Sequence, residues 1–135
     1  MEQITIETVV KAPVEKVWEA YTNPTHIVHW NFASDDWCCP RAENDLRVGG
    51  KFSSRMEAKD GTVGFDFGGV YEEVIPMRKL TYSFGDRKAM VLFSQEGTDT
   101  KVMVSFDPET ENPIEMQRSG WQTILNNFKE YTEGL

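Results

Sequence analysis

Histidine and cysteine side chains lie close together in one part of this 135-residue sequence and are of the types that bind zinc. They are His26 and His29, three residues apart, followed by the adjacent thiols Cys38 and Cys39. Zinc sites usually separate paired cysteines by about two to four residues, so adjacent thiolates are poorly spaced for one tetrahedral ion. We therefore expect no metal here, but two surface or half-buried histidines and two thiols in a loop.

Carboxylates are the next candidates, because a pair of them can share acid–base work. Asp35 and Asp36 are adjacent, but neighbouring aspartates in a loop more often cap a helix or face water. No serine has the surroundings of a nucleophile elbow, and Gly49-Gly50 is too short to cradle a phosphate. The sequence thus carries no catalytic signature, and we expect no cofactor.

Glu73 is a weak candidate for a catalytic role, beside the Asp35-Asp36 pair. If strand alternation holds, it shares a face with Tyr71 and Phe67, where burial would raise its pKa and suit it to proton transfer. The alternative is that Gly68-Gly69 forms a bulge that shifts the register and turns Glu73 to solvent. Glutamates are rarely buried without a partner, which favours the alternative.

Large apolar side chains recur on segments that a folded chain could gather around one pocket. The candidate ligand-binding residues are Trp30, Trp37, Met56, Phe67, Tyr71, Tyr82, Gly120, Trp121 and Leu125. The alternative is that they simply close the core. Gly120 is unusual because glycine costs about 1 kcal/mol inside a helix, so we expect it to allow close packing of a strand, or to leave room for a ligand.

Composition limits the partners. The formal net charge is −8 and 39% of the residues are hydrophobic. An acidic surface repels phosphate groups, which argues against nucleic acid and anionic membranes. The apolar runs are too short to span a bilayer, and the N-terminus has no signal-peptide pattern. We therefore expect a cytoplasmic protein with reduced thiols.

The elements that would position these residues follow from apolar periodicity and turn residues. The pattern predicts a strand over 3–10, a helix from Pro13, a short helix over 24–30 and an irregular segment over 31–45. It then predicts strands near 45–48, 51–58, 64–75, 79–84, 88–95 and 100–107, and a helix from Ile114 to the C-terminus. Asn112, Pro113 and Glu115 have the order of a capping box. The segments predict an α+β domain over residues 1–135, with an antiparallel sheet covered by the last helix.

Several motifs resemble one known family. They are Pro13 to Trp18, Trp30, Asp45, Gly49-Gly50, Asp60-Gly61, Gly69 to Pro76 and Gly120-Trp121. In this order they are similar to the AHSA1-like (activator of Hsp90 ATPase homologue) branch of the START-like/SRPBCC superfamily. The resemblance implies a helix-grip, Bet v 1-like fold: a curved antiparallel sheet around a long C-terminal helix, with two short helices after strand 1 and a cavity between sheet and helix.

The same resemblance implies several possible functions. Superfamily relatives use the cavity for lipids, hormones, polyketides or ring substrates, so binding of a small apolar or aromatic molecule is the leading hypothesis. A cavity enzyme of the cyclase or hydrolase type and a chaperone-assisting interaction module are the alternatives. Eukaryotic namesakes engage Hsp90 through a separate N-terminal domain, so we do not expect Hsp90 as a partner of this chain. The edge strands of such a sheet are available for pairing with a second copy, so the oligomeric state can be a monomer or a homodimer.

Overall fold

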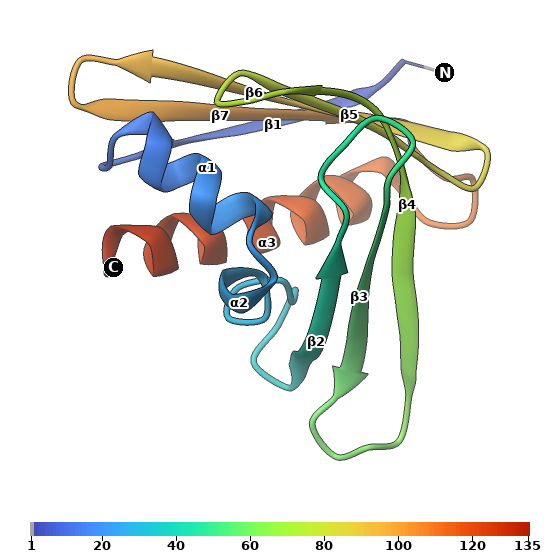
Figure 1. The fold of residues 1–135 in the computed structure, drawn as a ribbon. Coiled ribbons are helices and arrows are strands. Elements are labelled where there is room, and N and C mark those ends of the chain that lie inside the picture. Colours follow the sequence, from blue (N-terminus) through green and yellow to red (C-terminus); the bar gives the residue numbers. More distant parts are fainter. Residues whose placement is uncertain (1) are drawn as a thin grey trace.

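Seven antiparallel strands form one curved sheet that wraps around the long C-terminal helix (Figure 1). The computed structural model describes residues 2–135, so Met1 of the predicted 1–135 domain lies outside the described residues. Along the chain the elements are β1 (Ile4–Val10), α1 (Val14–Thr22), α2 (Pro24–Ile27), β2 (Trp37–Asn44), β3 (Lys51–Ala58), β4 (Gly64–Ile75), β5 (Lys79–Phe84), β6 (Arg87–Glu96), β7 (Asp99–Phe106) and α3 (Ile114–Glu133). The predicted helix-grip architecture is confirmed.

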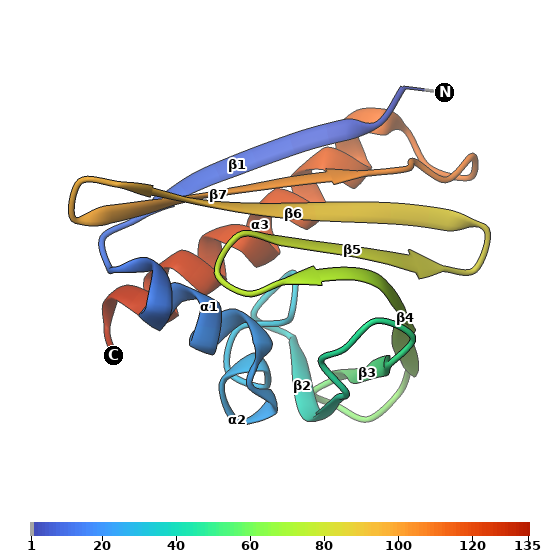
Figure 2. The same cartoon turned by 45° about the horizontal axis from the view of Figure 1, so that its top comes forward.

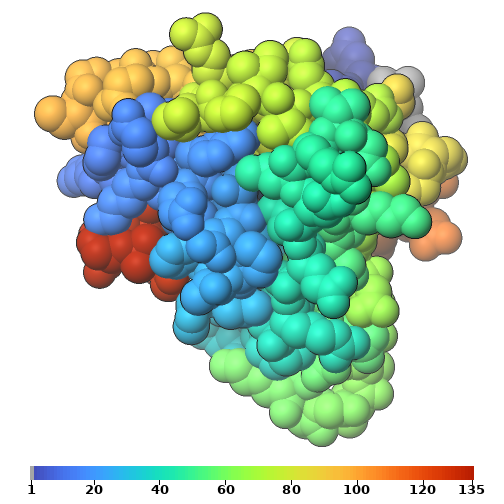
Figure 3. Space-filling view, viewed as in Figure 1, coloured from blue at the N-terminus to red at the C-terminus, as the bar shows by residue number. Residues whose placement is uncertain are grey.

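The strand order β1-β7-β6-β5-β4-β3-β2 places the two ends of the sheet far apart. Strands β1, β7, β6 and β5 lie above α3, whereas β2, β3 and the first half of β4 turn down beside it (Figures 1 and 2). The β3–β4 hairpin tip ends this second part and projects from the body of the molecule (Figure 3). The concave side of the sheet therefore faces α3 from two directions.

The chain between α2 and β3 differs from the expectation. Residues 37–44 form β2 rather than an irregular segment, and the strand predicted near 45–48 is a turn. Pro40 suggested a loop, but β2 lies at the edge of the sheet, where a missing N–H is tolerated. The following turn is fixed because Gly49 N–H donates to the Tyr71 carbonyl at 2.8 Å and Tyr71 N–H donates to the Gly50 carbonyl at 2.9 Å.

Helix α3 begins without the predicted capping box. Pro113 occupies the N-cap position and makes no side-chain cap bond. The buried Gln117 side chain ties the preceding loop to the first turn instead: its amide donates to the carbonyls of Glu109 and Asn112, and its oxygen accepts from Glu109 N–H. A side chain inside the helix thus fixes the loop that leads into it, but it does not cap the free N–H groups of the first turn.

One edge of the sheet is covered by side chains of α3. An exposed edge strand presents free backbone groups that can pair with another chain. Here three long polar side chains of the helix donate to alternate carbonyls of β1: Arg118 to Thr5, Gln122 to Glu7 and Lys129 to Val9. Pairing of two copies through β1 would have to break these bonds, so β2 is the edge left for strand pairing.

No helix within residues 2–135 is long and apolar enough to cross a membrane.

The bend of the sheet is located in β4, where glycine permits a close approach of two backbones. The first half of β4 pairs with β3 and the second half with β5. A Cβ atom on Gly69 would lie 2.2 Å from the Ser83 carbonyl oxygen and 3.1 Å from the Phe52 ring. Because the oxygen belongs to the backbone of the neighbouring strand, the strands themselves would have to separate to admit a side chain.

We expect Gly69→Ala to lower the free energy of unfolding by about 1–3 kcal/mol, the usual cost of overpacking. Urea unfolding followed by tryptophan fluorescence measures the change. The same substitution at Gly120 is the matched control, because no atom lies within 4 Å of an added Cβ there. It should raise stability by up to about 1 kcal/mol through helix propensity. Equal effects at both glycines would contradict the close-packing explanation.

Candidate functional site

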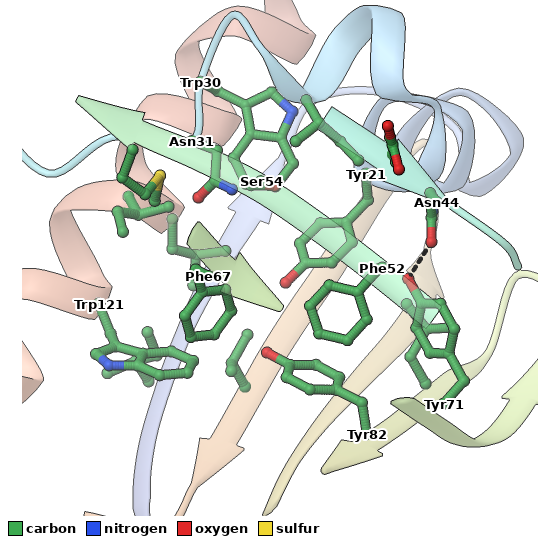
Figure 4. Close-up of a pocket in the computed structure, with 18 of the residues that line it drawn as sticks. Tyr21, Trp30, Asn31, Asn44, Phe52, Ser54, Phe67, Tyr71, Tyr82 and Trp121 are labelled. Atoms are coloured by element: carbon green, nitrogen blue, oxygen red, sulfur yellow. Dashed lines mark hydrogen bonds between the residues drawn. The ribbon is translucent and has the colours of Figure 1, made fainter. Parts of the chain in front are cut away.

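A cavity of about 260 Å³ lies between the concave face of the sheet, α3 and the α1–α2 segment (Figure 4). Its walls are mainly apolar and aromatic. The lining residues are Ile6, Tyr21, Ile27, Trp30, Asn31, Glu43, Asn44, Phe52, Ser54, Met56, Phe65, Phe67, Tyr71, Leu80, Tyr82, Val104, Trp121, Ile124 and Leu125. Side chains from most elements of the fold converge there, so the cavity exists only in the complete tertiary structure.

The structure brings together seven of the nine predicted ligand-binding residues. Those that line the cavity are Trp30, Met56, Phe67, Tyr71, Tyr82, Trp121 and Leu125. The other two, Trp37 and Gly120, are not among its lining residues. Trp37 packs on Phe65 at the far end of β2, with ring centroids 5.9 Å apart. No atom lies within 4 Å of a Cβ added to Gly120, so the predicted close packing of a strand is wrong, and the open space beside Gly120 is not part of the cavity.

Stacked rings give the cavity stiff, flat walls. Trp121 lies parallel to Phe106, with ring centroids 3.9 Å apart and 7° between the planes. Across the cavity, Phe52 contacts Tyr71 at 5.1 Å and Tyr82 at 4.9 Å between centroids. Such aromatic pairs are favourable beyond the area they bury. The rings are held by one another, which keeps them from collapsing into the space they enclose.

The polar groups at one end of the cavity form a chain of hydrogen bonds. Tyr71 Oη donates to Asn44 Oδ1 at 2.7 Å (Figure 4). Asn44 Nδ2 in turn donates to the Thr22 carbonyl at 2.6 Å. Burial raises the pKa of Tyr71 to about 12, although the bond to Asn44 opposes this. These bonds connect β4 and β2 to the end of α1, so the Tyr71 hydroxyl already donates its hydrogen bond within the protein.

Two other tyrosine hydroxyls point into the cavity and have no hydrogen-bond partner within residues 2–135. They belong to Tyr21 of α1 and Tyr82 of β5 (Figure 4). Burial is the main cause that raises the pKa of both, and the nearby Tyr71 phenol adds to it. Both hydroxyls therefore stay protonated at neutral pH and can donate or accept a hydrogen bond.

Several lining residues escaped the sequence prediction. Tyr21 lies on the apolar face of the first predicted helix, so its inward direction was readable but not its place beside Tyr82. Phe52 and Ser54 alternate with Met56 on β3, a period-two signal that would have found them. Asn44 was hidden because the strand that carries it was assigned to a loop.

Glu73 lies on the outer side of the sheet, not in the cavity. The β4–β5 register shifts between Tyr71 and Glu73, so that Glu72 is the extra residue of a bulge and the alternation is reset. Glu73 pairs with Lys79 at 2.8 Å, and this contact is the main cause that lowers the pKa of its carboxyl. The inward face that unbroken alternation would give is therefore wrong, and the favoured alternative, a bulge that turns Glu73 outward, agrees with the register. The bulge lies a few residues after the Gly68-Gly69 pair considered in the sequence.

The histidines and thiols do not assemble into one cluster. His26 Nδ1 lies 2.6 Å from Tyr131 Oη, and the His29 ring stacks on Tyr131. Both cysteines are free, and burial raises the pKa of the Cys39 thiol. In the described part of the chain no three His, Cys, Asp or Glu side chains are placed to hold a metal ion.

The arrangement of sheet, helix and cavity can be compared with known proteins. Residues 11–133 match the model of the family described as activator of Hsp90 ATPase homolog 1-like protein. The chain belongs to this family. No curated protein matches this chain.

Solved structures of similar proteins share the fold. The AHSA1-like protein of Aeromonas hydrophila is 41% identical, with a TM-score of 0.93, 98% of this chain covered and 92% of that one. A protein of Cytophaga hutchinsonii is 50% identical, with a TM-score of 0.84 and the same coverage. A protein of Chromobacterium violaceum is 25% identical, with a TM-score of 0.87 and coverage of 98% and 99%. Proteins with this START-like fold commonly bind hydrophobic ligands.

Proposed function

We propose that this AHSA1-like protein binds a small, mainly apolar or aromatic molecule in its cavity. The observation that carries the proposal is the cavity of about 260 Å³, walled by rings such as Phe52, Phe67 and Trp121. Its volume is near the lower end of the range of small-molecule sites, about 300–1,000 Å³. A ligand of two or three rings is the size that such a space accommodates.

The energetic cost of the space supports an occupant. The cavity is partly open to solvent, which lowers the cost of leaving it empty. If it were closed and dry, its 260 Å³ would cost about 6 kcal/mol at about 24 cal/mol per Å³. That is comparable to the whole stability of an ordinary domain. Water gains little from apolar walls, because it needs about two to four polar partners. A ring ligand would instead restore the packing contacts that the walls lack.

The alternatives have less support. The enzyme hypothesis depended on an inward carboxylate, and Glu73 is on the outer side of the sheet, in an ion pair with Lys79. Glu43 is the carboxylate that lines the cavity, but no histidine, lysine, arginine or second carboxylate lines it within residues 2–135 to share acid–base work. The interaction-module hypothesis requires an exposed apolar patch outside the cavity. Exposed apolar side chains such as Val48, Met77 and Met116 lie instead on separate loops and elements.

The uncharged probe N-phenyl-1-naphthylamine tests the proposal, since its fluorescence rises in apolar surroundings. Titration should give saturable binding with one probe per chain. Val104 lines the cavity from β7, and Val104→Phe should weaken binding at least about tenfold by filling the space. Val48→Phe is the matched control, because Val48 is 65% exposed on a loop.

Both variants are first checked for an intact fold by circular dichroism. No saturable binding to the unaltered chain would contradict the proposal. Equal weakening by Val48→Phe would show that the probe binds to the surface.

A further inference from the structure

We infer that the cavity selects an uncharged ring molecule with a hydroxyl or ketone oxygen that meets the hydroxyls of Tyr21 and Tyr82, and rejects the carboxylate of the same skeleton. The inference rests on the proposed function and names the class of ligand. It comes from the distribution of hydrogen-bonding groups and charges around the cavity.

The three tyrosines of the cavity differ in what their hydroxyls do. Tyr71 donates to Asn44 at 2.7 Å, and its bond is part of the fold. Tyr82 is 8% exposed, and its hydroxyl points into the cavity, as does that of Tyr21 (Figure 4). Neither has a hydrogen-bond partner among the described residues. Thr132 Oγ1 is the only fully buried side-chain N or O atom without a partner among the described residues, so the Tyr21 and Tyr82 hydroxyls keep accessible surface inside the cavity. A polar atom of a ligand can reach them there and supply the hydrogen bond that they lack.

The rings that carry these hydroxyls are fixed in place. Tyr21 packs edge-on against Phe128 at 5.1 Å, and Tyr82 packs edge-on against Phe52 at 4.9 Å between centroids. The two hydroxyls therefore point at the cavity from opposite elements, α1 and β5, without having to move. A preorganised pair of donors binds an acceptor oxygen at little ordering cost.

The charges around the cavity oppose an anionic ligand. Within residues 2–135 no lysine, arginine or histidine lines the cavity, and its one charged lining residue is Glu43. Arg87 is near enough to influence Tyr82, but its guanidinium lies over the Phe84 ring and donates to the Asp107 carbonyl. A carboxylate in the cavity would lose its hydration without gaining a cation, which is strongly unfavourable.

Competition against N-phenyl-1-naphthylamine with three probes of one skeleton tests the inference: naphthalene, 2-naphthol and 2-naphthoate. One neutral hydrogen bond corresponds to about a two- to tenfold difference in affinity. 2-Naphthol should therefore compete about two- to tenfold better than naphthalene, and at least about tenfold better than the ionised 2-naphthoate. Tyr82→Phe or Tyr21→Phe should reduce the advantage over naphthalene, and the two together should abolish it.

Tyr131→Phe is the control, because Tyr131 hydrogen-bonds His26 outside the cavity and its loss should leave the probe ranking unchanged. Tight competition by 2-naphthoate, or an advantage of 2-naphthol that survives loss of both cavity hydroxyls, would overturn the inference while leaving the binding function intact. Failure of the fluorescent probe to bind at all would remove the proposed function, and the inference with it.

Discussion

Replacing Phe128 by alanine should lower the free energy of unfolding by about 3–5 kcal/mol, the usual cost of removing a buried phenylalanine. Phe128 is completely buried on α3 and does not line the cavity. Its ring packs edge-on against Tyr21 of α1 at 5.1 Å and against Trp30 at 5.0 Å. The side chain therefore joins α3 to the α1–α2 segment, and its loss opens a second void beside the cavity.

Urea denaturation monitored by circular dichroism measures this change. Phe65→Ala is the matched control, because Phe65 is 51% exposed near the hairpin tip and should lose less than about 1 kcal/mol. The expectation would be wrong if the two variants lost the same stability. The free energy of unfolding of an ordinary domain is about 5–15 kcal/mol, so Phe128→Ala removes a large part of it and should also lower the midpoint of thermal unfolding.

Alkaline pH should destabilise the protein steeply, starting near pH 10. Burial raises the pKa of Tyr21, Tyr71 and Tyr82 in the folded state, that of Tyr71 to about 12. Above pH 10 the unfolded chain loses phenolic protons that the folded chain keeps, so the unfolded state binds fewer protons and stability falls as pH rises. A tyrosine that is ionised in the unfolded chain and protonated in the folded chain lowers the stability by about 1.4 kcal/mol per pH unit. The three tyrosines together lower it by at most about 4 kcal/mol per pH unit. Tyr21 contributes less than the full amount, because it retains accessible surface.

Tyr82→Phe isolates this effect from the titration of lysines. The variant loses no hydrogen bond within the described residues and removes one of the three phenols. Its stability should fall less steeply between about pH 10 and pH 12, by about 1.4 kcal/mol per pH unit relative to the unaltered chain. Urea unfolding at a series of pH values gives both slopes. Parallel slopes would show that Tyr82 ionises as readily in the folded chain as in the unfolded one.

The elements with a clear local pattern could be predicted, and the exceptions have identifiable causes. The ranges 51–58, 64–75 and 79–84 agree with β3, β4 and β5, because alternation and turn residues mark both ends of each. Strand β2 was missed because Pro40 and two cysteines give no alternation, and its pairing with β3 is a tertiary effect. Unbroken alternation gives the wrong direction for Glu73 because one bulge residue, Glu72, reverses the side chains that follow, and the rarity of buried glutamates was the signal that favoured the outward face.

The site was predictable to the extent that its residues belong to an apolar stripe or face. Trp121 and Leu125 repeat at helical spacing on α3, and Tyr82 alternates along β5, so their inward direction follows from periodicity. Trp37 has the same residue type as Trp121, but it begins the edge strand β2, packs on Phe65 and is not itself among the lining residues of the cavity. Residue type and spacing say which face is buried, but not which neighbour lies across it.

The sequence by itself determined the antiparallel sheet, the long final helix and the family, because these depend on local periodicity and on the order of short motifs. Only the tertiary structure decided that Tyr71 is committed to Asn44 while Tyr21 and Tyr82 keep free hydroxyls in one cavity. That distinction depends on distances between α1, β2, β4 and β5, which lie far apart along the chain. Such long-range distances are fixed by the bend at Gly69 and by packing against α3, and no local pattern carries them.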